Sequence, residues 1–279
     1  MKESLRYISN QLSSLYDARE CNSIARYIVE EISGMTYTDI LVKDTKFSAV
    51  DREKIEEITK RLLGGEPMQY VLGYTYFCGL KIFVNNKVLI PRPETEELCQ
   101  LIIENYKESS PKILDVCTGS GCIALALKYG IENASVEGVD ISEGALDVAK
   151  SNSTSSNCDV AFYKYDVLSA QPKIEGEYDI IVSNPPYICQ FEKEKMSDNV
   201  LDNEPHIALF VEDENPLVFY IKIADLGCET LKPNGRLFFE INPLFYNEMI
   251  EMLAQKGYRD IEVIKDINER NRFIACTKI

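Results

Sequence analysis

The sequence contains no tryptophan and a single histidine, His206, among its 279 residues. None of its nine cysteines forms a Cys-x-x-Cys pair. A zinc site made of cysteine and histidine is therefore not expected, and no residue is assigned as a metal ligand. An odd number of scattered cysteines also argues against a disulfide framework and is typical of reduced thiols. Reduced thiols in turn predict a cytoplasmic protein.

Long apolar runs are missing as well. No stretch reaches the roughly 18 consecutive apolar residues that a membrane-spanning helix needs, so no membrane association is expected. The amphipathic start, Met1–Arg6, lacks the apolar segment of a signal peptide.

Positive charge is scarce too, because 30 Lys and Arg stand against 45 Asp and Glu, for a net charge of −15. Proteins that bind nucleic acid tightly usually carry a basic surface. Direct binding of nucleic acid is therefore not expected. The hydrophobic share of 45% is ordinary for a globular protein, and the length predicts one large or two ordinary domains.

The first 67 residues show only helical periodicity. Ile24, Ile28 and Ile32 recur at helical spacing before a possible stop at Gly34. We expect a helical domain over 1–67. Residues 68–91 are rich in aromatic and β-branched side chains, and Asn85-Asn86 separates two apolar runs, which predicts a β-hairpin linker.

From residue 92 to the end, short apolar runs alternate with helical patterns. This alternation predicts an α/β domain over 92–279, built on a parallel, doubly wound, Rossmann-like sheet. Ligands of such sheets bind at the carboxyl ends of the strands. Seven strands are expected, at 112–116, 135–139, 159–163, 179–182, 236–239, 260–264 and 272–277.

The ends of the first three expected strands carry residues suited to a ligand that contains adenosine. A glycine turn follows the first strand and lets a ligand approach the backbone. Asp140, at the end of the second strand, is placed to accept hydrogen bonds from a ribose diol. Asp166 is placed to accept from an adenine amino group, with Val167 against the ring. The residues of the turn are Cys117, Thr118, Gly119, Ser120 and Gly121.

Two adenosine cofactors remain after this step, a nicotinamide dinucleotide and S-adenosyl-L-methionine. Cys117 stands where the dinucleotide fingerprint has its first glycine. The fourth strand also ends without the His or Tyr-Lys proton relay that hydride transfer usually needs. Both observations favour S-adenosyl-L-methionine.

The fourth expected strand ends in a rigid corner, Asn184-Pro185-Pro186-Tyr187. The prolines fix the backbone and cannot join a sheet ladder. The Asn184 side-chain oxygen and the Pro185 carbonyl are suited to accept both N–H groups of a planar amide or amino nitrogen, while Tyr187 stacks on its plane. Such acceptors favour the positive charge that nitrogen gains during methyl transfer. We therefore expect Asn184, Pro185, Pro186 and Tyr187 to form the catalytic corner, with Asn184 also touching the cofactor.

These motifs together resemble the HemK/PrmC family. The resemblance implies a class I methyltransferase fold that uses S-adenosyl-L-methionine to methylate N5 of the Gln in the Gly-Gly-Gln motif of class I peptide chain release factors. It also implies that the helical domain docks the release factor. Cys117 departs from the usual Gly of the family, and Val167 from a frequent Trp. The resemblance rests on Gln69-Tyr-Val-Leu-Gly73, Phe77-Cys-Gly79, Val88-Leu-Ile-Pro-Arg-Pro-Glu-Thr-Glu96, Asp115 to Gly121, Ser183 to Ile188 and Glu204-Pro-His206.

Two other functions remain open from the sequence. The Asn-Pro-Pro-Tyr corner also suits methylation of adenine N6 in DNA, or of ribosomal RNA, although the net charge of −15 disfavours it. A non-catalytic adenosine-binding protein is the second alternative, which an intact corner disfavours.

Overall fold

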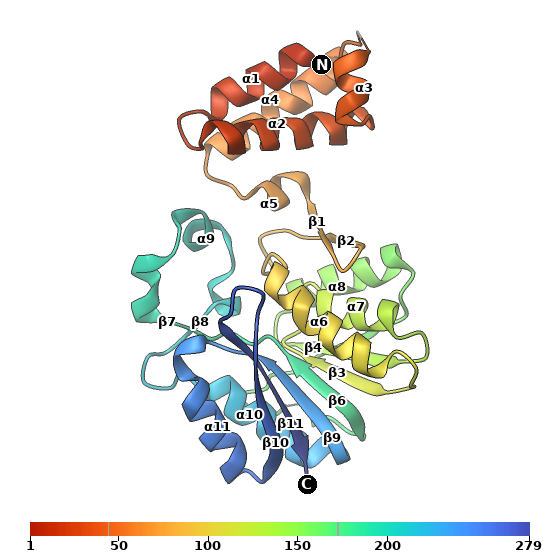
Figure 1. Ribbon diagram of the computed structural model, residues 1–279, viewed down its shortest axis with the longest axis vertical. Helices are drawn as coiled ribbons and strands as arrows, with labels where there is room; N and C mark the ends of the chain where they lie inside the picture. Colours follow the sequence, from red (N-terminus) through yellow and green to blue (C-terminus); the bar gives the residue numbers. More distant parts are fainter. Residues whose placement is uncertain (44, 172) are drawn as a thin grey trace. The chain divides into compact units, whose positions relative to one another are not determined.

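The computed structural model describes residues 1–43, 45–171 and 173–279. The chain forms two compact units, Met1–Leu72 and Gly73–Ile279 (Figure 1). Within the described residues, no helix is both long and apolar enough to cross a membrane.

The first unit is all-helical, as the sequence predicts. Its helices carry one apolar face each, and these faces pack into a common core. The fully buried members of that core include Ile8, Leu12, Ile28, Ile40, Ile55 and Leu62. The helices are α1 (Lys2–Leu12), α2 (Ala18–Ser33), α3 (Tyr37–Val42), α4 (Ala49–Leu63) and α5 (Met68–Leu72).

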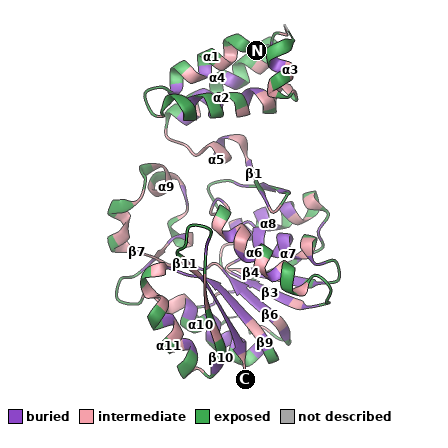
Figure 2. Ribbon diagram, viewed as in Figure 1, coloured by how far each residue is buried: buried purple, intermediate pink, exposed green. Residues whose placement is uncertain are grey.

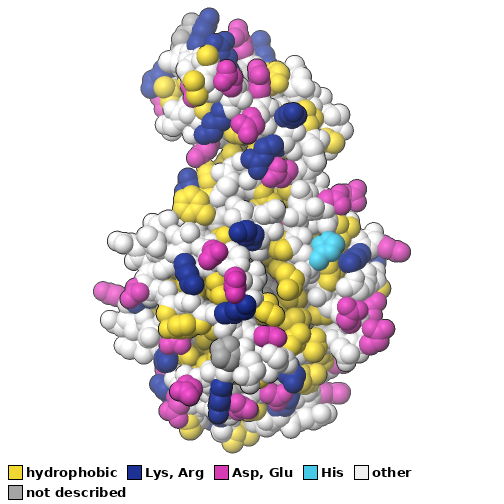
Figure 3. Space-filling view, turned by 180° about the vertical axis from the view of Figure 1, so that it is seen from behind, with side chains coloured by type: hydrophobic (Ala, Val, Ile, Leu, Met, Phe, Trp, Pro, Cys, Tyr) yellow, Lys and Arg dark blue, Asp and Glu magenta, His cyan; other side chains and the backbone are white. Residues whose placement is uncertain are grey.

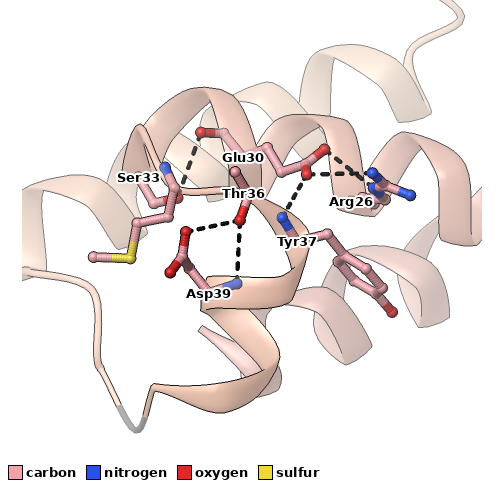
Figure 4. Close-up of polar contacts among 7 residues, drawn as sticks. Arg26, Glu30, Ser33, Thr36, Tyr37 and Asp39 are labelled. Carbon is pink, nitrogen blue, oxygen red and sulfur yellow. Dashed lines mark hydrogen bonds and ion pairs between the residues drawn. The ribbon is translucent and has the colours of Figure 1, made fainter.

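The corner between α2 and α3 is held by polar contacts of two acidic residues (Figure 4). Glu30 pairs with Arg26 at 3.1 Å and accepts the backbone N–H of Tyr37 at 2.6 Å. The Thr36 hydroxyl caps α3 by accepting the N–H of Asp39, and it donates to the Asp39 carboxylate at 2.7 Å. The Glu30 carboxylate and the Thr36 hydroxyl thus each accept an N–H group that the start of α3 would otherwise leave unpaired.

The second unit begins with a hairpin of β1 (Tyr74–Phe77) and β2 (Leu80–Phe83). Its turn is formed by Cys78 and Gly79, so the hairpin turn predicted at Asn85-Asn86 is wrong. The chain does turn after Asn85, where the Val88 N–H donates to the Asn85 carbonyl at 3.1 Å, but no pair of described strands flanks that turn. Two-residue hairpin turns favour positive φ at their central residues, and Cys78 and Gly79 have φ values of +47° and +79°. Both dipeptides have turn chemistry, and only pairing between the strands decides between them.

A seven-stranded sheet forms the centre of the second unit, and the predicted number of strands is confirmed. The order across the sheet is β10-β11-β9-β6-β3-β4-β5. Figure 2 shows most of this sheet in the buried colour. The strands are β3 (Lys112–Val116), β4 (Ser135–Asp140), β5 (Ala161–Lys164), β6 (Tyr178–Ser183), β9 (Leu231–Glu240), β10 (Tyr258–Lys265) and β11 (Asn271–Lys278).

The sheet is mixed, and the prediction of an all-parallel sheet is wrong for one strand. β11 runs antiparallel to both of its neighbours, β9 and β10. Only residues 266–270 connect β10 to β11. A parallel pair needs a crossover of a dozen or more residues, so this short connection permits only a hairpin.

Helices cover both faces of the sheet (Figure 1). One face carries α6 (Pro93–Tyr106), α7 (Cys122–Gly130) and α8 (Glu143–Ser156), and the other carries α10 (Val218–Thr230) and α11 (Tyr246–Gln255). The remaining elements are β7 (Ile188–Cys189), β8 (Phe210–Val211), α9 (Asp198–Asn203) and the 3-10 turns η1 (Gln190–Lys195), η2 (His206–Ala208) and η3 (Pro243–Phe245).

Pairing of β3 with β6 sets the place of the site. Val116, the last residue of β3, is in register with Ser183, the last residue of β6. The Ser183 hydroxyl also donates to the Val116 carbonyl. From β3 the chain turns to β4 and β5 on one side and returns to β6 on the other, which makes this edge the topological switch point.

Asn152 of α8 joins the hairpin to the turn after β3. Its amide nitrogen donates to the Phe83 carbonyl at 3.0 Å and the Ser120 carbonyl at 2.9 Å, and its oxygen accepts the Phe83 N–H at 2.7 Å. The side chain is fully buried, so water does not replace these bonds.

Asp115 of β3 is a fully buried acid with one unpartnered oxygen. Its Oδ2 accepts from the Thr118 hydroxyl at 2.5 Å and the Ala124 N–H at 3.2 Å, whereas Oδ1 has no hydrogen-bond partner among the described residues. Burial raises the pKa of Asp115 from 3.8 to about 7, against the lowering effect of those two bonds. The folded protein therefore holds a proton that the unfolded chain releases between these pH values.

Replacing Asn152 by Ala should lower the free energy of unfolding by about 2–3 kcal/mol, because it leaves buried backbone groups of Phe83 and Ser120 unpaired. Denaturant unfolding followed by circular dichroism measures this change. Asn105→Ala is the matched control, since within the described part of the chain its exposed amide bonds only the Leu101 carbonyl of its own helix. It should change the free energy of unfolding by no more than about 0.5 kcal/mol. Equal effects of the two changes would contradict the role of Asn152.

The buried Asp115 should make stability fall as pH rises. Since its folded-state pKa lies above the unfolded value, its favourable contribution is present at low pH and is lost as pH approaches about 7. Between pH 5 and pH 8, Asp115 should account for a fall of roughly 2–3 kcal/mol in the free energy of unfolding. Asp115→Asn should remove that fall, whereas Asp147→Asn, on the exposed face of α8, should keep it. Parallel pH curves for wild type and Asp115→Asn would refute the prediction.

Candidate active site

A cavity of about 1090 Å³, a figure that includes its open mouth, lies in the second unit at the carboxyl ends of β3, β4 and β6. Figure 3 shows apolar side chains gathered in a hollow of this unit. Most of the residues predicted from the sequence lie on the cavity wall: Cys117, Thr118, Gly119, Ser120, Asp140, Asp166, Val167, Asn184 and Pro186. Gly121, Pro185 and Tyr187 are not part of the wall.

The turn after β3 needs left-handed backbone at three positions. Cys117, Gly119 and Gly121 have φ values of +63°, +55° and +80°. A Cβ atom on Gly121 would lie 3.0 Å from the Phe162 ring and 3.1 Å from the Ala149 methyl. Gly121 thus allows the turn to pack on β5 and α8 and does not contact the cavity itself. Cys117 is not a glycine, so its left-handed conformation costs backbone energy that glycine would avoid.

Asp140 is held rigidly at the wall. Its two carboxylate oxygens accept the backbone N–H groups of Gly119 and Ser142, each at 2.9 Å. Burial raises the pKa of Asp140, and the N–H bonds act in the opposite direction. Each carboxylate oxygen has two acceptor sites, so Asp140 keeps acceptor capacity for a hydroxyl pair after binding both amides.

The third strand end supplies a second carboxylate beside apolar surface. Asp166 Oδ1 accepts the N–H of Leu168 at 3.0 Å, and Val167 is buried between them in the chain. All three line the cavity, together with Ile141. Two fixed carboxylates, with apolar side chains between, fit the hydroxyls, amino group and ring of an adenosine.

The Asn-Pro-Pro-Tyr corner splits between the cavity and the interior. Asn184 and Pro186 line the cavity, and Pro185 is buried. The Tyr187 ring packs against the core beneath α10 and α11, and its hydroxyl donates to Glu240 at 3.0 Å. Burial raises the pKa of Tyr187.

Two polar residues behind Asn184 were not assigned by the sequence. Thr95 accepts from the Asn184 amide nitrogen at 3.2 Å and donates to Glu240 at 2.7 Å. Thr95 lies inside the Pro91-Arg-Pro-Glu-Thr-Glu96 segment, which carries part of the family resemblance. Membership of that segment was the one sequence signal that could have identified Thr95 as a site residue. Glu240 ends the apolar strand β9 and is fully buried there.

A partly buried ion pair joins two segments of the rim that are distant in the sequence. Arg92 contacts the Glu204 carboxylate at 2.5 Å, and the other oxygen of Glu204 accepts the Ile90 N–H at 3.1 Å. Arg92 lines the cavity, as do Ile207 and Ala208 on the segment that follows Glu204. Loss of Arg92 would leave the buried Glu204 carboxylate without its cationic partner, so this contact helps to hold the two rim segments together.

His206, the sole histidine, does not line the cavity. Its Nε2 lies 2.8 Å from the Leu201 carbonyl, and its ring meets the Phe210 ring edge-on at 5.2 Å. These contacts give it a part in packing the segment between β7 and β8.

Comparison with known proteins agrees with this geometry. A family model described as the methyltransferase small domain matches residues 93–206, and a model described as the PrmC N-terminal domain matches residues 3–73. Among solved structures, a methyltransferase from Pyrococcus furiosus aligns with a TM-score of 0.53 at 19% identity, over 72% of this chain and 89% of that one. A Thermus thermophilus 16S rRNA N2 G1207 methyltransferase, solved with AdoMet and guanosine, aligns with a TM-score of 0.52 at 18% identity, over 74% of this chain and 50% of that one. These similarities show the methyltransferase fold.

Similarity to curated proteins extends over the whole sequence. A protein of Bacteroides thetaiotaomicron named release factor glutamine methyltransferase is 43% identical over 279 residues, which cover 100% of both chains. A protein of the same name from Lactococcus lactis is 36% identical over 98% of both chains. With both of its units matched by family models and full-length relatives at this identity, the chain belongs to the release factor glutamine methyltransferase family.

Proposed function

We propose that this protein transfers a methyl group from S-adenosyl-L-methionine to N5 of the Gln in the Gly-Gly-Gln motif of class I peptide chain release factors. The observation that carries the proposal is one cavity in which Asn184 and Asp140 share the wall. Asp140 belongs to the strand ends suited to adenosine, and Asn184 to the corner suited to a planar amide. The names of the full-length relatives support the same substrate.

The residues proposed for the cofactor would hold S-adenosyl-L-methionine and orient its methyl group. Asp140 and the Gly119 turn would bind the ribose, and Asp166 with Val167 would bind the adenine. When bound, S-adenosyl-L-methionine supplies an electrophilic methyl group on a sulfonium. The rim residues Arg92 and Ile207 would limit the access of water.

The target residues act on an amide nitrogen, whose lone pair is delocalised and therefore weakly nucleophilic. The Asn184 oxygen, on the cavity wall, would accept one of its N–H groups. The backbone carbonyl of Pro185, whose residue is buried next to the wall, is kept as the proposed acceptor of the other, which leaves the lone pair free to face the methyl group. Fixed carbonyl dipoles favour the positive charge that develops on this nitrogen, and positioning alone lowers the barrier further. No base is needed before transfer, because the methylated cation is strongly acidic and then loses its proton.

The role of Tyr187 in this proposal differs from the stacking on the substrate amide that the sequence predicts. Its hydroxyl lies on Glu240 and its ring packs against the core, so it supports the corner from behind. This placement favours orientation of Asn184 and Pro185 over stacking on the substrate.

The substrate prediction is tested with labelled S-adenosyl-L-methionine and four acceptors: release factor, release factor whose Gly-Gly-Gln glutamine is changed to Ala, duplex DNA and ribosomal RNA. Label is expected on the first alone, at the glutamine located by mass spectrometry. Label on nucleic acid with none on release factor would replace the proposal by the adenine-N6 or ribosomal RNA alternative. Label on none of the four would favour an adenosine-binding protein.

Asn184→Ala should reduce kcat on release factor by about 10²–10³-fold, because it removes one fixed acceptor from the charge that forms on nitrogen. The dissociation constant of S-adenosyl-L-methionine, measured by calorimetry, should change by less than about 3-fold, since Asp140 and Asp166 remain. Asn105→Ala, exposed on α6, is the control and should keep wild-type values. A near-normal kcat for Asn184→Ala would remove the acceptor role.

A further inference from the structure

We infer that Thr95 and Glu240 are positioning residues that fix the Asn184 amide with its oxygen facing the cavity. The inference rests on the proposed function, in which that oxygen accepts an N–H of the substrate amide. An asparagine amide has a donor end and an acceptor end of nearly equal size. Rotation by half a turn would present the NH₂ group to the substrate and abolish the acceptor.

Three hydrogen bonds connect the corner to one buried acid. The Asn184 amide nitrogen donates to Thr95 Oγ1 at 3.2 Å, and Thr95 Oγ1 donates to Glu240 Oε2 at 2.7 Å. The Tyr187 hydroxyl donates to Glu240 Oε1 at 3.0 Å. Thr95 is 2% exposed and Glu240 is 1% exposed, so water does not compete for these positions. The four residues come from α6, β9 and the corner itself.

Proton counting sets the direction of this chain. A hydroxyl has one proton, and an ionised carboxylate only accepts. The Thr95 proton is therefore committed to Glu240, and Thr95 offers only lone pairs to Asn184. The amide oxygen of Asn184 facing Thr95 would place two acceptors together without a proton. The NH₂ end must face Thr95, and the oxygen is left for the cavity, whose wall includes Asn184.

The charge on Glu240 controls this direction. Burial raises the pKa of Glu240, and Glu94 adds to this effect, while the Thr95 and Tyr187 hydroxyls and Arg272 of β11 act against it. From α10, the Tyr220 hydroxyl donates to the Glu240 backbone carbonyl at 3.2 Å. Protonated Glu240 is able to donate to Thr95, which frees the Thr95 proton for the amide oxygen and permits the reversed orientation. Turnover should therefore fall as pH falls through the raised pKa of Glu240.

The test compares two substitutions at Thr95. Thr95→Val has nearly the same shape without the hydroxyl, and Thr95→Ser keeps the hydroxyl without the methyl. Thr95→Val should reduce kcat on release factor by about 10–100-fold, while the KM for release factor and the dissociation constant of S-adenosyl-L-methionine stay within about 3-fold. Thr95→Ser should keep kcat within about 3-fold. Thr230→Val is the matched control, because among the described residues this buried hydroxyl bonds only the Leu226 carbonyl of its own helix, and it should leave kcat unchanged.

A double variant separates positioning from packing. If Thr95 acts through Asn184, then adding Thr95→Val to Asn184→Ala should cause little further loss of kcat. Multiplied losses in the double variant would overturn the inference. Wild-type-like kcat for Thr95→Val would overturn it too, as would an equal loss for Thr95→Ser, which would assign the effect to the methyl group.

Folding is checked by melting temperature. If Thr95→Val fails to fold because the Glu240 charge is left with one partner fewer, Thr95→Val/Glu240→Gln removes that charge and still lacks the hydroxyl. The same loss of kcat is expected, and a folded double variant with wild-type kcat would overturn the inference.

Neutron diffraction on wild-type crystals gives a result that does not depend on the substrate. Deuterons of the Asn184 amide are expected on the side of Thr95, and an amide oxygen found there would overturn the inference. If wild type labels no release factor, the proposed function fails. If wild type is active and Thr95→Val is equally active, only the inference fails.

Discussion

The parallel pairing of β3 with β6 is the constraint on which the candidate site depends. The register that places Val116 beside Ser183 ends both strands at the same level. The glycine turn then starts from one strand and the Asn-Pro-Pro-Tyr corner from the next. Side chains almost 70 positions apart in the sequence share one cavity wall for this reason. The two halves of the proposed reaction, a methyl donor and an amide acceptor, meet because of a sheet register.

The sequence predicted the strand ends well because each carries a local signal. The turn at Gly119, Asp140 after an apolar run, and the prolines after Asn184 are all readable within a few residues. The pairing partners were harder. Cys78-Gly79 and Asn85-Asn86 both have turn chemistry, and the direction of β11 depends on the length of a connection. Thr95 and Glu240 are 145 residues apart, and their hydrogen bond has no local pattern.

Buried acids support this cavity from several sides. Glu204 holds the rim through Arg92, Glu240 stands behind Asn184, and Asp115 lies beneath the glycine turn. Each is almost fully removed from solvent, a state that costs free energy unless partners compensate. The partners differ: a guanidinium and the Ile90 N–H for Glu204, two hydroxyls for Glu240, and a hydroxyl with one N–H for Asp115. The site is therefore held largely by polar contacts whose directions are fixed, which suits a reaction that depends on orientation.

Asn152 stands apart from these acids because it carries no charge. It binds the hairpin and the Ser120 carbonyl through an amide, whose donors and acceptor do not titrate in the range where proteins are folded. The support of the glycine turn from α8 is thus insensitive to acidity and to ionic strength. As the medium changes, the turn keeps its anchor while the acids around it change charge.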